Sequence, residues 1–298
     1  MGSQTSSHQD PELFNVYEMD WQRGDVPGVL DGVDVRSLSV DPATDSASFM
    51  ARLPPEWQVT VDARDGTLEI FLLGGDLSAN GQRVGTAGFV AVPRGSGSCE
   101  LASSAGATGF VFWSPGPRLQ DSYDGGLHVV RTWEQPWMPG NMLGLDLVRM
   151  YKPLRVPDPS SEEAHGGAGG ILHLVCHLPG HRWADKEVHR NCWEEVFMLR
   201  GDNLMPDRGL LGPGTYLGNP AGHQHGVITS QRGALMIRHT SGPADMEMSP
   251  FPGGVEVIEE YLESGSWLED PRTEKWVDRP EHSFLTEFQA QQGEEGKT

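Results

Sequence analysis

Two histidines and two glutamates of this sequence stand at spacings that suit one metal ion. Glu187 and His189 are two residues apart, so their side chains share a face if the segment is a β-strand. Glu194 follows after enough residues for a turn into the next strand, and His225 comes about thirty residues later. Imidazole nitrogens and carboxylate oxygens both bind divalent ions. The spacing therefore predicts a metal centre assembled from three strands.

The composition indicates which elements position these residues. The chain of 298 residues contains 38 glycines and 22 prolines, well above the average usage of these turn-forming residues. Short apolar runs lie between the turns, for example Leu68–Leu73, Gly88–Val92 and Gly109–Trp113. Short strands separated by turns are typical of sandwiches and barrels. We therefore expect an all-β fold rather than a helical bundle.

The charge of the chain limits its partners. The formal net charge is -20, and such an excess of carboxylates repels phosphate groups. We expect a small-molecule substrate, with no nucleic-acid and no membrane partner. Three cysteines do not make a disulfide framework, and no segment reads as a secretion signal or a membrane span. A cytoplasmic location is the resulting expectation.

An internal repeat organises the sequence. Leu53-Pro54 matches Leu178-Pro179, and Pro93-x-Gly95 matches Pro220-x-Gly222, at a nearly constant offset. Between these pairs, five residues of the first copy (Glu69, Phe71, Leu73, Gly75, Asp76) recur in the second (Glu195, Phe197, Leu199, Gly201, Asp202). The matches predict two similar β units joined by a linker near residues 145–165.

The repeat divides the chain into four parts. We expect an N-terminal arm over residues 1–20, a first β unit over 21–150 and a second β unit over 151–253. Residues 254–298 form a C-terminal helix and an acidic tail. The helix is predicted from the apolar spacing of Val257, Tyr261 and Leu262, and it should end at Gly265.

The first unit lacks the metal-binding residues of the second. Leu68 stands where Glu194 should be, Ser98 stands where His225 should be, and the segment Val61–Arg64 has no histidine. The first unit is therefore expected to bind no metal at this location and to act as a scaffold.

Two motifs of the second unit resemble those of the cupin family. Residues 187–201 read EVHRNCWEEVFMLRG, which fits ExH(x)4E(x)6G, and residues 214–225 read GTYLGNPAGHQH, which fits G(x)5PxG(x)2H. The family pattern has His where Glu187 stands and Asn where Thr229 stands. Because the resemblance covers both repeats, the chain resembles a bicupin. The strings WEEVFMLRGDN and PGTYLGNPAG resemble the ChrR-type branch of that family.

This resemblance implies a fold and a cofactor. The fold would be two cupin-type β-barrels in tandem, each a jelly roll or double-stranded β-helix. The cofactor would be one divalent metal ion per chain, with Fe(II) favoured and Zn(II), Mn(II), Co(II) or Ni(II) as alternatives. The ligands would be His189, Glu194, His225 and Glu187. A homodimer is implied by the family as well.

Several residues leave two interpretations open. Glu187 is either a ligand or a catalytic base, and His223 either competes as a ligand or lines the site as a catalytic residue. Glu194 is a better ligand than Glu195, because the partner of Glu195 persists in the unit without metal ligands. Only one of Arg238 and His239 can face the barrel interior. An inward Arg238 would be either a catalytic residue that binds a substrate carboxylate or a member of a structural ion pair.

The predicted function is that of a metal-dependent enzyme that binds the oxygen atoms of a small organic substrate. The set of histidines and carboxylates resembles that of non-haem iron oxygenases, which favours a dioxygenase. A non-redox isomerase, cyclase or lyase needs the same site without O2, since one fold hosts many reactions. A ChrR-like zinc-binding sensor is a further alternative, and a metal-free storage or carbohydrate-binding bicupin is another.

Overall fold

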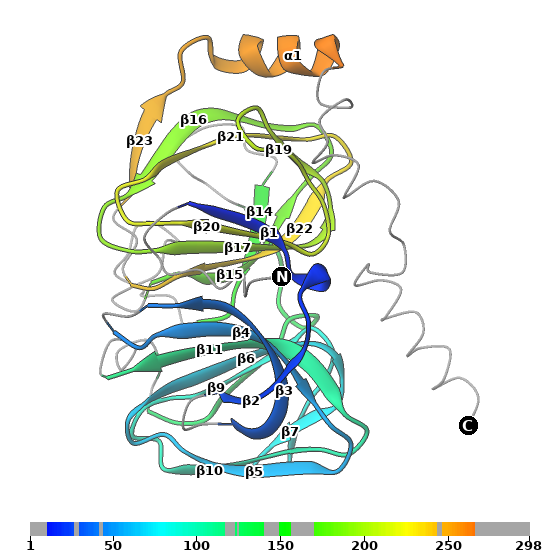
Figure 1. Cartoon of the computed structure of the whole chain (residues 1–298), viewed down its shortest axis with the longest axis vertical. Helices are drawn as coiled ribbons and strands as arrows, with labels where there is room; N and C mark the ends of the chain where they lie inside the picture. The colour runs from blue at the N-terminus through cyan, green and yellow to red at the C-terminus, as the bar shows by residue number, and fades with distance from the viewer. Residues whose placement is uncertain are drawn as a thin grey trace, which may run out of the picture.

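The short apolar runs of the sequence form antiparallel strands in two barrels (Figure 1). The computed structural model describes residues 11–26, 30–41, 44–116, 123, 125–139, 149–155, 170–242 and 246–265. Every strand pair among them is antiparallel. The all-β prediction is confirmed.

The first barrel has a sheet of seven strands and a sheet of four. In spatial order, the larger sheet contains β12 (His128–Arg131), β9 (Gly88–Val92), β6 (Gly66–Gly75), β11 (Ala107–Pro115), β4 (Ala47–Leu53), β3 (Leu30–Val40) and β2 (Gln22–Val26). The smaller sheet contains β5 (Trp57–Asp62), β10 (Ser98–Ser103), β7 (Leu77–Ala79) and β8 (Gln82–Val84).

The second barrel has a sheet of seven strands and a sheet of five. The larger sheet contains β1 (Glu12–Asn15), β20 (Thr215–Asn219), β17 (Glu194–Gly201), β22 (Ala234–Thr240), β15 (Leu172–His177), β14 (Arg149–Pro153) and β13 (Met138–Pro139). The smaller sheet contains β19 (Gly209–Leu211), β18 (Asn203–Met205), β21 (Gln224–Ser230), β16 (His181–His189) and β23 (Met246–Pro250).

The two barrels repeat one topology. The order β9-β6-β11-β4-β3 in the first barrel corresponds to β20-β17-β22-β15-β14 in the second. The order β5-β10-β7-β8 corresponds in the same way to β16-β21-β18-β19. The strands that correspond are those that the sequence repeat aligns. The duplication predicted from the sequence is therefore visible in the strand order of both sheets.

Strand pairing divides the chain differently from the predicted boundaries at residues 20 and 150. Strand β1 lies within the predicted arm, yet it pairs with β20 of the second barrel (Figure 1). Strands β13 and β14 precede most of the second unit but extend its larger sheet. Strand pairing satisfies the backbone N–H and C=O groups at an open sheet edge. For β20 the pairing strand is β1, which lies near the start of the chain.

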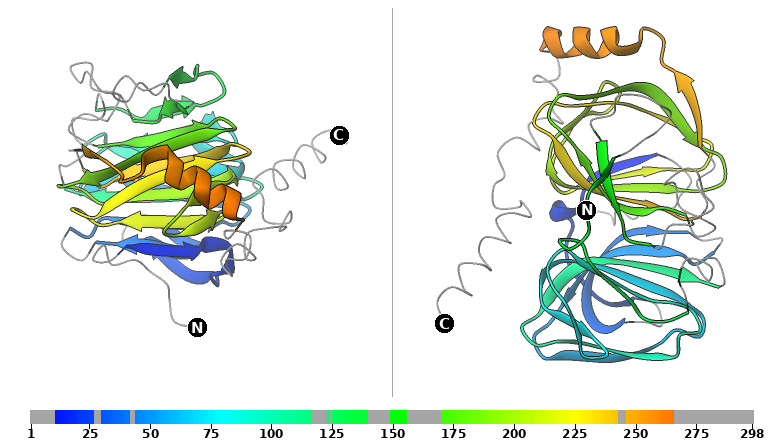
Figure 2. Two further views of the ribbon diagram at one scale, coloured as in Figure 1. Left: turned by 90° about the horizontal axis from the view of Figure 1, so that it is seen from above. Right: turned by 180° about the vertical axis from the view of Figure 1, so that it is seen from behind.

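The C-terminal segment begins with the predicted helix. Helix α1 spans Gly254–Ser264, ends at Gly265 in a left-handed conformation (φ 66°), and lies at the end of the second barrel remote from the first (Figure 2). No described segment forms a helix long and apolar enough to cross a bilayer. Residues 1–10, much of the predicted linker and the acidic tail after Gly265 lie outside the described residues.

The larger sheets of the two barrels pack against each other. Strand alternation sends one set of side chains into each barrel and the other set toward the neighbouring barrel. One apolar cluster joins Phe71 and Phe110 of the first barrel to Phe197 and Ile237 of the second. The ring centroids of Phe110 and Phe197 lie 4.1 Å apart. At roughly 25 cal/mol per Å² of apolar area buried, such contact strongly stabilises the tandem arrangement.

Two buried glutamates related by the repeat lie at this interface. Glu195 accepts hydrogen bonds from Ser48 Oγ and Tyr216 OH, each at 2.6 Å, and from Ser39. Because Ser39 and Ser48 belong to the first barrel, this carboxylate connects the two sheets. A buried carboxylate costs several kcal/mol unless it is paired and hydrogen-bonded. These donors explain why Glu195 has a structural role.

Glu69 has the corresponding place in the first barrel. It accepts from Tyr123 OH at 2.5 Å and from Arg155 Nε and Nη2 at 2.7 and 2.8 Å. Arg155 also donates to the carbonyl oxygen of Thr240 in the second barrel, at 3.4 Å. Burial raises the pKa of Glu69, but the charge and hydrogen bonds of Arg155 outweigh burial and hold this pKa below its usual 4.5.

The interior of the first barrel is apolar. Leu68, which aligns with Glu194, is fully buried in a cluster that also contains Val61, Ile70 and Val92. Ser98, which aligns with His225, is exposed. In this barrel, apolar side chains therefore fill the space that polar ligands occupy in the second.

The Glu69–Arg155 pair makes stability depend on acid pH. Because the folded pKa lies below the unfolded value, the ionised carboxylate stabilises the fold fully above about pH 4.5, and this contribution is lost as the pH falls through the folded pKa. At pH 7, Glu69→Gln should lower the free energy of unfolding by about 3–5 kcal/mol, because Arg155 is left buried without its partner. Below pH 4.5 the difference from wild type should shrink.

Urea denaturation at several pH values measures this effect. The matched control is Glu100→Gln, an exposed glutamate of the same barrel, for which a change below about 0.5 kcal/mol is expected. A Glu69→Gln profile parallel to that of wild type at every pH would show that the pair does not cause the acid sensitivity.

Candidate metal centre

Strand register brings the four predicted ligands together inside the second barrel. Glu187 of β16 is directly opposite His225 of β21, and His189 lies two residues further along β16 on the same face. A register shift lies between Trp183 and Lys186, where β16 pairs with β21. Gly226 has φ 114° at this point, and a Cβ there would come within 2.6 Å of the Asp185 carbonyl oxygen. Glycine thus permits the close approach that sets this register.

The fourth residue comes from the larger sheet. Glu194 is the first residue of β17 and lies opposite Asn219 of β20. Alternation turns its neighbour Glu195 toward the first barrel. The structure therefore places Glu194, rather than Glu195, with the two histidines.

The donor atoms of these residues form a compact buried group. One atom from each of Glu187, His189, Glu194 and His225 lies within 4.8 Å of the others, and the four residues are at most 6% exposed. His225 Nε2 is 2.7 Å from Glu194 Oε2 and 3.3 Å from Glu187 Oε1. His189 Nε2 is 3.6 Å from Glu194 Oε1. Nitrogen and oxygen atoms so arranged can surround one divalent ion.

Hydrogen bonding around His225 tests whether a cation fits. Its Nδ1 lies 3.0 Å from the His223 carbonyl oxygen, which accepts only, so Nδ1 carries the proton. A neutral His225 then directs the Nε2 lone pair at two carboxylates, so either a proton or a metal cation is needed between these groups. His225 Nε2 and Glu187 Oε2 are buried and have no hydrogen-bond partner among the described residues. The donor set therefore fits a divalent metal.

The pKa shifts of His225 and Glu187 also indicate that the buried carboxylates need a positive charge beside them. Burial lowers the pKa of His225, but Glu194 and Glu187 outweigh this effect and raise it to about 10. Burial raises the pKa of Glu187, but the charge of Arg238 outweighs it, and this pKa falls to about 2. A proton on His225 is thus the alternative to a metal ion.

Arg238 is the arginine that faces the site. Its neighbour His239 lies in the other direction, with Nδ1 2.6 Å from Glu195 Oε2 at the interface. Arg238 Nε donates to Glu194 Oε1, and Nη2 lies 3.1 Å from His189 Nε2 and 3.4 Å from Glu187 Oε1. The guanidinium is buried and contacts three of the four predicted ligands.

His223 lies beside the group rather than in it. Its ring is half-buried and parallel to that of His225, with centroids 6.5 Å apart. Its Nε2 is 3.3 Å from Arg208 Nη2 and accepts from that guanidinium. Burial and the charge of Arg208 lower the pKa of His223. The structure therefore places His223 as a neutral base next to the site.

The sequence motifs did not identify two residues that lie beside the candidate ligands. Asn219 Nδ2 donates to Glu194 Oε2 at 3.1 Å, and Arg208 Nη2 donates to Asn219 Oδ1 at 3.2 Å. Asn219 immediately precedes Pro220 of the second motif, so strand pairing with Glu194 could have indicated it. Arg208 lies in a turn after β18, where no pattern marks it.

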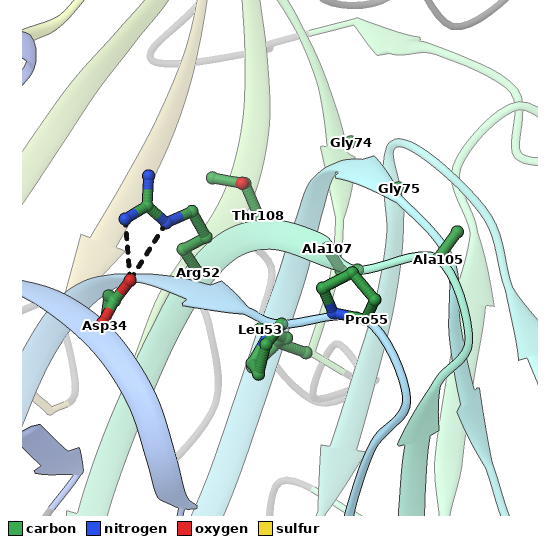
Figure 3. Close-up of a pocket in the computed structure, with 11 residues that line it drawn as sticks. Asp34, Arg52, Leu53, Pro55, Gly74, Gly75, Ala105, Ala107 and Thr108 are labelled. Carbon is green, nitrogen blue, oxygen red and sulfur yellow. Dashed lines mark hydrogen bonds and ion pairs between the residues drawn. The ribbon is translucent and has the colours of Figure 1, made fainter. Parts of the chain in front are cut away.

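A cleft of about 530 Å³ in the first barrel has few polar groups that could bind or activate a substrate (Figure 3). Its two charged side chains, Arg52 and Asp34, pair with each other at 2.7 Å. The remaining lining is apolar side chains, one threonine and glycine backbone. Because these groups satisfy one another, the second barrel is the better candidate for the active site.

Several solved structures resemble this chain over most of its length. A candidate dioxygenase from Nostoc punctiforme is 16% identical, with TM-score 0.64 over 82% of this chain and 87% of that chain. A candidate glyoxylate-induced protein from Pseudomonas aeruginosa is 12% identical, with TM-score 0.60 over 81% and 90%. Escherichia coli YlbA is 11% identical, with TM-score 0.54 over 79% and 92%.

No protein-family model and no curated protein matches the sequence. At such low identities, structural similarity establishes the fold and not the activity. The neighbours are cupin-fold proteins, and they align with both barrels of this chain. The chain therefore has the cupin fold in its two-barrel form, a bicupin with its candidate metal ligands in the second barrel.

Proposed function

We propose that this protein is a metal-dependent enzyme that acts on a small organic molecule, and that its reaction is a dioxygenase reaction with Fe(II). The observation that carries the proposal is the buried group of two imidazoles and two carboxylates, whose His225 Nε2 faces carboxylate oxygens and needs either a proton or a metal cation beside them. A set of two histidines with a carboxylate is the ligand type of non-haem iron oxygenases. The similarity to a candidate dioxygenase supports the same class.

The residues divide into ligands and neighbours. His189, Glu194, His225 and Glu187 would hold the ion, which supplies Lewis acidity toward substrate oxygens and, as Fe(II), reactivity with O2. A carboxylate with pKa about 2 is a weak base at neutral pH, so Glu187 suits a ligand role better than a base role.

The surrounding cations favour an acidic substrate. Arg238 contacts Glu194 directly, and Arg208 reaches the same carboxylate through Asn219. Guanidinium groups bind carboxylates and enolates well. His223 is neutral and half-buried, and it can accept a proton from a substrate once the substrate displaces the hydrogen bond that Arg208 donates to its Nε2. We propose a small carboxylic acid or an enolisable dicarbonyl compound as the substrate.

The ligand assignment predicts which histidine holds metal. Protein purified with one ion per chain should lose it in His225→Ala, because a direct ligand is removed, and metal affinity should fall by more than the roughly 10–100-fold typical of groups that only orient ligands. His223→Ala is the matched control, a histidine two residues away that should retain the ion. Elemental analysis and calorimetric titration measure both. Equal metal content in the two variants would refute the assignment.

The reaction class is tested by oxygen consumption. The Fe(II)-loaded protein should consume O2 with an acidic substrate, and the Zn(II)-loaded protein should not. Turnover without O2 uptake would contradict the dioxygenase and support an isomerase, cyclase or lyase at the same site. Stoichiometric zinc with no turnover of any tested compound would support the ChrR-like sensor instead.

A further inference from the structure

The atoms that Arg238 engages are the atoms that a metal ion needs. Arg238 Nη2 donates to His189 Nε2 at 3.1 Å, and Nε donates to Glu194 Oε1. An imidazole nitrogen has one lone pair, which either accepts a hydrogen bond or binds a metal. His189 therefore cannot bind an ion while Arg238 holds its Nε2.

Arg238 also supplies the charge that a metal would supply. Two carboxylates, Glu187 and Glu194, are buried within the group, and such charges are costly without a partner. The guanidinium donates to Glu194 and lies 3.4 Å from Glu187. Arg238 is itself 4% exposed, so water does not screen these contacts. Arg238 thus offsets one of the two negative charges of the group.

The other cationic side chains described near the site are directed at different partners. Arg208 contacts Asn219 and His223 but none of the four ligand residues. Lys186, adjacent to Glu187 on β16, points its ammonium at the ring of Phe251, 5.0 Å from the centroid. Strand alternation therefore selects Arg238 of β22 as the cation in contact with the ligands.

We propose that Arg238 is an intramolecular competitor for the metal: it holds the ligand set while the metal is absent and must withdraw from His189 when a divalent ion binds. The inference rests on the proposed metal site and describes how that site is loaded. Withdrawal frees guanidinium donors beside the ion, where they can meet an acidic substrate. Arg238 thereby lowers metal affinity while it preserves the metal-free fold.

Metal titration of Arg238→Met tests the proposal, with Zn(II) as the probe in a calorimeter. Loss of the competing charge should lower the dissociation constant at least tenfold. The metal-free variant should melt below wild type because two buried carboxylates lose their partner, and Zn(II) should raise its Tm by more than it raises that of wild type. Arg208→Met, a nearby arginine without ligand contacts, should change the dissociation constant by less than about threefold.

Two outcomes separate this inference from the proposed site. Wild-type and Arg238→Met protein that bind Zn(II) equally well, or a variant that binds more weakly, would overturn the competition and leave the site intact. Failure of wild-type and all variants to bind Zn(II) would overturn the site itself, and the inference with it.

A second measurement does not depend on the variant folding well. The side-chain Nε–H resonance of Arg238, assigned in isotope-labelled wild-type protein by through-bond correlation to its backbone, should shift or exchange faster with solvent when Zn(II) is added. An unchanged resonance at saturating Zn(II) would show that the guanidinium stays in place, and would overturn the proposal.

Discussion

The alternation of side chains along β17 is the constraint on which the rest of this structure depends. Glu194 points into the second barrel and Glu195 points out of it, so two adjacent carboxylates enter two different buried environments. One meets imidazoles and a guanidinium, and the other meets hydroxyl groups of the neighbouring barrel. A shift of one residue in register would exchange them and disrupt the metal centre and the barrel interface together.

Duplication followed by divergence explains why two similar barrels have different interiors. Both keep a buried glutamate at the interface, Glu69 and Glu195, because each satisfies donors that link the two sheets. The second keeps the four candidate metal ligands in its interior, and in the first Leu68 and its apolar neighbours fill the corresponding space. The first barrel therefore contributes a packing surface, and the second contains the candidate metal centre.

Turn-rich composition and the internal repeat predicted a duplicated all-β fold. Motif spacing predicted the four clustered residues, because strand alternation and turn length determine which side chains can converge. The sequence did not show whether Arg238 or His239 faces the barrel interior, because alternation requires only that one of two neighbouring residues does so. It could not predict that β1 pairs with β20 or that Arg155 reaches Glu69, because these contacts join segments far apart in sequence. Arg208 was missed for the same reason: its partners come from another loop and strand.

Anomalous diffraction at the absorption edge of the metal locates the ion in crystals of the full chain grown with saturating metal. We expect one peak per chain, about 2.0–2.2 Å from His189 Nε2, His225 Nε2 and a Glu194 oxygen, and none in the first barrel. A peak coordinated elsewhere, or a fully occupied guanidinium at that position with no metal peak, would contradict the assignment of the metal centre.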